Sequence, residues 1–305
     1  MQRISAIDVK TAVQQISPYL EDTSNDAPQF IYFDGWLGLG ASAVLRAIAE
    51  TPPRSLREKF DRIIHIDCWM WKSRRALQRV IADELKLTQQ VVAIDAQDEE
   101  DDFSGVDHGS RAEVRDIRGV IGRYLVQYRC LVIFHNGSSN TVDLASFGIP
   151  MLEFLGTKVL WTFRGQLRLN IEIQEKVENS HLFVFAGGRN SNWNAYLEEE
   201  AREIALHMQK LGLGVTPKIA TECCLYLLSL NNQGKKMIDY NWATHASCYW
   251  VCDGIIGGGQ DNQTWEVAHA LQQHIRLEDY SSNTELMGPV NRLDLSSKQW
   301  ISITE

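Results

Sequence analysis

The chain has 305 residues, of which 44% are hydrophobic and 23% are charged, a composition typical of a globular protein with one large domain or two to three modest ones. The formal net charge is −9 and the sequence contains no block of lysine and arginine, which argues against a nucleic-acid partner. No apolar run approaches the ~20 residues that a membrane helix needs, and no signal-peptide pattern opens the chain. We therefore expect a cytoplasmic protein without membrane insertion.

Residues 1–28 are expected to form one N-terminal helix followed by a linker. A polar stretch over residues 22–28 closes this segment. The apolar residues before it recur at helical spacing: Ile7, Val9, Val13, Ile16 and Leu20.

A glycine-rich turn follows the apolar run at residues 30–33 and precedes a periodic, helix-like segment. A strand, a glycine turn and a helix N-terminus in this order direct several backbone N–H groups at one point, where a phosphate group can bind. The turn fits the frame G-x-x-x-x-G-K-[ST], except that Ala41 replaces the lysine. A tight connection without a ligand is the alternative. The candidate contacts are Gly35, Gly38, Leu39, Gly40, Ala41, Ser42 and Ala43.

Four further short apolar segments follow, at residues 62–67, 130–134, 158–163 and 181–185. Helical periodicity over residues 72–87 and 111–127 separates some of them. The alternation predicts an α/β fold, with a parallel five-stranded sheet between two helix layers over residues 29–190. Ligands of such folds lie at the carboxyl ends of the strands.

The acidic run from Asp98 to Asp102 interrupts this pattern. We expect residues 95–109 to form a solvated loop, because no glycine or ligand spacing organises the run as a metal site, although a metal or a basic partner is the alternative.

The C-terminal part is expected to be helical. Residues 191–240 contain helix patterns at 193–211 and 217–230, with Pro217 in a first turn. Residues 241–305 contain helix patterns around 248–256 and at 263–277, with a triple glycine at 257–259 that we interpret as a flexible connection.

The six cysteines lie mostly in apolar segments, as buried free thiols do in a reducing compartment. His245, Cys248 and Cys252 are conceivable zinc ligands, but the pair spacing is not C-x-x-C, so we expect core cysteines.

Taken together, four segments resemble the NB-ARC module of plant disease-resistance proteins, a STAND-class P-loop NTPase. Residues 35–44 resemble the family's G-M-G-G-I-G-K-T-T-L, and residues 60–85 resemble its next strand, tryptophan-rich turn and long helix. Residues 158–164 resemble the strand that ends in T-T-R, and residues 250–256 resemble W-I-A-E-G-F-I. The resemblance implies a nucleotide-binding domain, a helical (ARC1-like) subdomain and a winged-helix-like (ARC2-like) end.

The chain departs from the family at the residues that carry chemistry. His135 and Asn136 stand where the family has two aspartates, one for magnesium and one for the attacking water. Residues 292–294 read Arg-Leu-Asp where the family has M-H-D. The leucine-rich repeats of the family are also absent from the sequence.

The resemblance implies ADP or ATP as the ligand, bound weakly and without magnesium, with no catalytic residues and no metal site. It adds Arg164 as a γ-phosphate sensor and Pro217, in a loose match to G-L-P-L-A, to the cofactor-binding residues. The implied role is a non-hydrolysing, switch-like interaction or regulatory protein in plant immune signalling, with protein partners. Two alternatives are an ATPase that uses His135 or Asp34, and a structural pseudodomain with an empty cleft.

Overall fold

The computed structural model describes residues 2–24, 27–36, 39–67, 73–136, 144–149, 157–163, 181–187, 193–232, 242–257 and 262–275. The chain divides into two compact units. The sheet unit comprises Met1–Gly35 and Val44–Gly188, and the helical unit comprises Trp36–Ala43 and Arg189–Glu305. The residues of the glycine turn from Trp36 onward therefore belong with the C-terminal helices.

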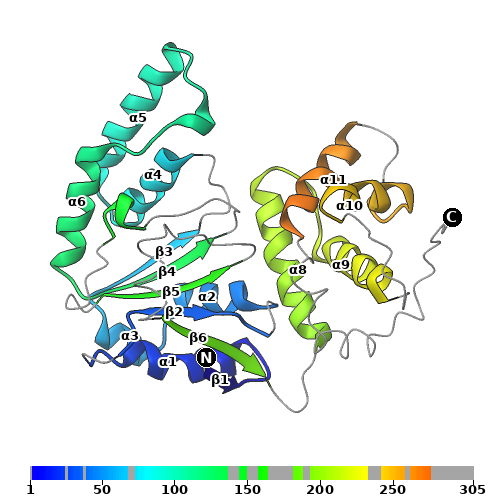
Figure 1. Cartoon of the computed structure of the whole chain (residues 1–305), viewed down its shortest axis with the longest axis horizontal. Coiled ribbons are helices and arrows are strands. Elements are labelled where there is room, and N and C mark those ends of the chain that lie inside the picture. Colours follow the sequence, from blue (N-terminus) through cyan, green and yellow to red (C-terminus); the bar gives the residue numbers. More distant parts are fainter. Residues whose placement is uncertain are drawn as a thin grey trace. The chain divides into compact units, whose positions relative to one another are not determined.

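The sheet unit contains one six-stranded sheet in which every pair of neighbours is parallel. Its order is β1-β6-β2-β5-β4-β3 (Figure 1). The strands are β1 Gln2–Ser5, β2 Phe30–Phe33, β3 Arg62–Asp67, β4 Cys130–Asn136, β5 Lys158–Phe163 and β6 His181–Gly187. All five expected strands are present and parallel, which confirms the α/β class.

The expected number of five strands is wrong, because the N-terminal segment adds a sixth. β1 pairs with β6, with Ile4 opposite Ala186, and the Ala6 N–H donates to the Gly187 carbonyl at 3.1 Å. Only then does helix α1, Val9–Glu21, begin, and Asp8 caps it by accepting the Thr11 N–H at 2.7 Å. A strand of four residues with one buried side chain carries too little periodicity to be recognised from sequence.

Both faces of the sheet are buried. One face packs against helices α4 (Arg74–Glu84), α5 (Thr88–Phe103) and α6 (Arg115–Val126), which contribute Leu77, Ile81, Ile94, Ile121 and Leu125 to its core. The alternate residues of the strands, among them Ile31, Phe33, Leu131, Ile133 and Leu160, are also fully buried. Figure 1 shows α1 and α3 (Arg54–Lys59) along the side of the sheet opposite α4 and α6.

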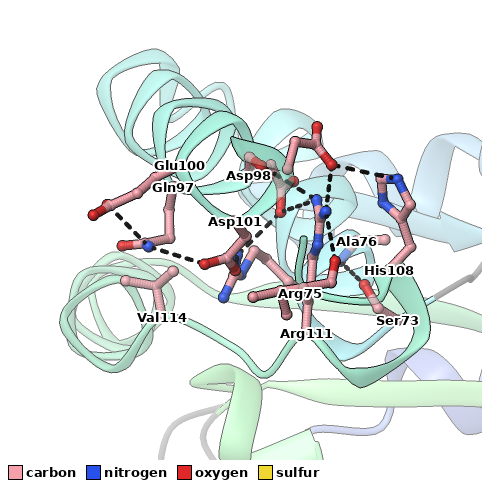
Figure 2. A network of polar contacts seen from close by, with 12 residues as sticks. Ser73, Arg75, Ala76, Gln97, Asp98, Glu100, Asp101, His108, Arg111 and Val114 are labelled. Carbon is pink, nitrogen blue, oxygen red and sulfur yellow. Dashed lines mark hydrogen bonds and ion pairs between the residues drawn. The ribbon is translucent and has the colours of Figure 1, made fainter. Parts of the chain in front are cut away.

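The acidic run forms the second half of helix α5 and is not the solvated loop that the sequence predicted. Two buried arginines explain the difference. Arg75 pairs with Asp98 at 3.1 Å and with Asp101, and Arg111 pairs with Asp98 at 3.2 Å and with Asp102 (Figure 2). The acidic run is therefore the surface through which α5 binds the two arginines of the sheet unit.

The helical unit contains α8 (Trp193–Lys210), α9 (Pro217–Asn232), α10 (Trp242–Cys252) and α11 (Asn262–His274). α8 packs on α9, and α10 packs on α11. Trp250 is fully buried in this unit, and its indole N–H donates to the Cys223 carbonyl at 3.2 Å. The expected helices at 193–211 and 217–230 are present, whereas residues 276–305, on which the winged-helix-like expectation partly depends, lie outside the described residues.

Candidate functional site

The glycine turn between β2 and α2 (Ala41–Glu50) is built from left-handed backbone and a short reciprocal bridge. Gly35 and Gly40 have φ values of +67° and +68°, a region that glycine enters without a steric penalty. Trp36 N–H donates to the Leu39 carbonyl at 2.9 Å, and Leu39 N–H donates back at 3.3 Å. The turn therefore has the tight backbone geometry that the sequence predicted.

An aromatic stack anchors the turn to helix α8. The Trp36 indole lies parallel to the Tyr196 ring, with centroids 4.3 Å apart and 11° between the planes. Both residues are almost completely buried. A Cβ atom at Gly40 would lie 3.0 Å from two carbons of the Trp36 ring, so the stack also restricts position 40 to glycine.

The N–H of Gly40, immediately before α2, is bonded to a carboxyl oxygen. It donates to Oε2 of Glu200 in α8 at 3.0 Å, and Glu200 is only 2% exposed. A carboxylate at this position also interacts favourably with the positive end of the α2 dipole. The chain itself thus supplies an anion at the place where a phosphate loop binds phosphate.

Glu200 and Tyr196 are functional candidates that sequence reasoning missed. They are four residues apart on α8, so both side chains project from the same face of that helix. One contacts Trp36 and the other contacts Gly40. Their spacing is recognisable in the sequence, but nothing local connects it with a loop 160 residues away.

The other predicted contacts divide between the start of α2 and positions that are not described. Leu39, Ala41, Ser42 and Ala43 are buried around the first turn of α2. Pro217 is the first residue of α9, in agreement with its predicted first-turn position, and its side chain is exposed. Gly38 and Arg164 lie outside the described residues.

His135 lies near the carboxyl end of β4, at a position where the family resemblance places an aspartate. His135 is 1% exposed, and its Nδ1 lies 3.1 Å from Nε2 of His65 on the neighbouring strand β3. Asp67 is in register with His135 and pairs with Arg46 of α2 at 3.5 Å. His65, Asp67 and His135 therefore lie on one face of the sheet, as alternate and registered positions of parallel strands do. Asn136 is the last residue of β4, and its side chain is not described.

Thr162 fixes the spacing of two strands next to the turn. Its hydroxyl donates to the carbonyl of Phe33, the last residue of β2, at 2.7 Å, and the side chain is buried. The Ala186 N–H of β6 donates to the Gly35 carbonyl at 2.8 Å. Hydrogen bonds from both neighbouring strands thus hold the point where β2 ends and the turn begins.

Over the described ranges, no group of three or more His, Cys, Asp or Glu side chains is placed to hold a metal ion. None of the helices described combines the length and apolarity required to cross a bilayer. Cys130, Cys223 and Cys224 are buried free thiols. Cys248 is half-buried and Cys252 is exposed, so the expectation of a core cysteine is wrong for Cys252.

No protein-family model matches the chain, and no match was found among curated proteins.

Proposed function

We propose that the chain is a non-hydrolysing nucleotide-binding module of the NB-ARC kind, which acts through protein partners as a switch-like regulator in plant defence signalling. Its ligand would be ADP, bound weakly by backbone N–H groups and without magnesium, in the cytoplasm. The carrying observation is the bond from Gly40 N–H to an anionic oxygen at the start of α2. A turn that holds a carboxylate there has a polarity suited to a phosphate oxygen.

Loss of hydrolysis follows from the groups at the two positions that phosphoryl transfer requires. Ala41 supplies no charge to the phosphates, and the imidazoles of His65 and His135 supply no hard anionic oxygen for magnesium. Loss of the lysine contact costs about 1.5–3 kcal/mol, which weakens binding by one to two orders of magnitude without abolishing it.

The direct test is mass spectrometry of ligand released from natively purified protein, combined with calorimetric titration of ADP with and without magnesium. We expect weak binding that magnesium barely changes. Gly40→Ala should weaken it further, whereas Gly105→Ala, at another left-handed glycine, should not. Tight, strongly magnesium-dependent ATP binding would contradict the proposal.

One observation favours a second candidate, an interaction domain that binds no nucleotide. Because Glu200 already accepts the Gly40 N–H, the turn is stable without an external anion. No released nucleotide and no ADP binding at millimolar concentration would favour this candidate over the first.

A further inference from the structure

We propose that Glu200 is an internal anion that occupies the phosphate position of the glycine turn, so that a ligand's phosphate group must displace this side chain before it can bind. The inference rests on the proposed function, because it concerns regulation of the same site. It makes α8 the element that sets the affinity of the turn for phosphate.

The first step of the argument is that the carboxylate and a phosphate compete for the same donor. The Gly40 N–H is a single donor, and it lies 3.0 Å from Glu200 Oε2. A phosphate oxygen at the same distance from this N–H would bring two anions into contact. The side chain of Ala41 carries no charge that could offset their repulsion.

The second step is burial. Glu200 is 2% exposed, so bulk water does not screen the interaction of its carboxyl group with the Gly40 N–H and the helix N-terminus. A ligand must therefore overcome a bond of the charge-assisted kind, rather than displace water alone.

The third step connects this competition with a movement. Tyr196 and Glu200 lie on the same face of α8 and contact Trp36 and Gly40 respectively. If a phosphate displaces Glu200, the bond between Glu200 and the Gly40 N–H is lost, whereas the Trp36–Tyr196 stack does not depend on that bond. Phosphate binding would thus loosen α8 from the turn, which is a way to transmit the presence of a ligand into the helical unit.

The experiment compares the wild type with Glu200→Gln in full-length protein. The glutamine keeps the length and an acceptor oxygen for the Gly40 N–H but removes the charge. Glu198→Gln is the matched control, because it removes the same charge from an exposed position of the same helix, where the residue forms an i,i+4 pair with Arg202 at 3.8 Å. Inorganic pyrophosphate and ADP are the two probes, titrated by calorimetry without magnesium, and hydrogen exchange reports on the Gly40 amide.

We expect Glu200→Gln to bind both probes about tenfold more tightly than the wild type, and Glu198→Gln to bind them as the wild type does. Exchange at Gly40 should be faster in Glu200→Gln and should become slower again when pyrophosphate is added. Equal, measurable affinities in the wild type and Glu200→Gln would overturn the inference and leave the proposed function standing. No binding of either probe to either protein would overturn the proposed function, and the competition with it.

Discussion

The indole of Trp36 is stacked on the ring of Tyr196 at a centroid separation of 4.3 Å, and the Trp36 ring lies directly beside Gly40. The turn is therefore held by this apolar stack as well as by the hydrogen bond from Gly40 to Glu200. Since Trp36 and Tyr196 are 1% and 2% exposed, the contact contributes the hydrophobic free energy of two large aromatic side chains. The steric wall and the left-handed backbone impose separate restrictions on position 40.

Gly40→Ala should therefore cost more stability than a left-handed glycine normally does. The φ of +68° alone predicts a loss of about 1 kcal/mol, and the 3.0 Å contact of the new Cβ with the Trp36 ring should raise it to about 2–3 kcal/mol. Gly105→Ala is the matched control, because its φ is +72° but its Cβ would meet nothing within 4 Å. Urea unfolding monitored by circular dichroism measures the free energy of unfolding of both variants. Equal losses would mean that the Trp36 ring moves away from the new Cβ atom at no cost.

Arg75→Met should weaken the attachment of α5 to the rest of the sheet unit. The side chain of Arg75 is 10% exposed, pairs with Asp98 at 3.1 Å and also donates to the Ala112 carbonyl at 3.0 Å. Removing it takes the arginine partner from Asp101 and leaves Asp98 with Arg111 alone, at a cost of about 3 kcal/mol. Arg54→Met removes an exposed pair with Glu58 and should change the free energy of unfolding by less than about 0.5 kcal/mol. Similar effects of the two variants would contradict a docking role for the acidic run.

The same cluster predicts loss of stability in acid. Hydrogen bonds from Arg75 and Arg111 hold the pKa values of Asp101 and Asp102, respectively, below the usual range. As pH falls below about 4, the unfolded chain binds protons before these folded carboxylates do, so the free energy of unfolding decreases. Urea titrations at pH 6, 4 and 3 should show a smaller decrease in Asp102→Asn than in the wild type. A parallel decrease in both would exclude Asp102 as a contributor.

The sheet could be predicted from the sequence because each of the five expected strands is a short apolar run bounded by polar or glycine residues. Segments 30–33 and 158–163 coincide with β2 and β5 as observed. The acidic run was misread because its charges suit both a solvated loop and a helix, and the arginines that decide between them lie 9 to 26 residues away. Glu200 was missed for the same reason. Its significance depends on a contact spanning 160 residues, which no local pattern encodes.

Cys130 should make stability fall in alkali. Burial raises the pKa of this thiol to about 11, so between about pH 9 and 11 the unfolded chain loses the proton while the folded chain keeps it. The unfolded state then binds fewer protons, and the free energy of unfolding should decrease over this window by about 2–3 kcal/mol. Cys130→Ala should flatten this part of the pH profile relative to Cys252→Ala, whose removed thiol is exposed. Identical profiles for the two variants would be inconsistent with a buried, protonated Cys130.

Ala41→Lys should have an effect that depends on Glu200. In Ala41→Lys, the new side chain would start from the first turn of α2, next to Gly40, whose N–H donates to the Glu200 carboxyl group. An ion pair between the two would neutralise the lysine and tighten the internal bond, so the single variant should gain less than about threefold in ADP affinity. In Ala41→Lys with Glu200→Gln, the lysine is available to the ligand, and the gain over Glu200→Gln alone should be about tenfold or more.

Neither variant should hydrolyse ATP in a single turnover, because the described end of β4 still presents His135 in place of a carboxylate for magnesium. A double-mutant cycle measured by calorimetry gives the coupling directly. Additive gains would show that Glu200 and position 41 act independently, and phosphate release above that of Gly40→Pro would show that the site retains catalysis.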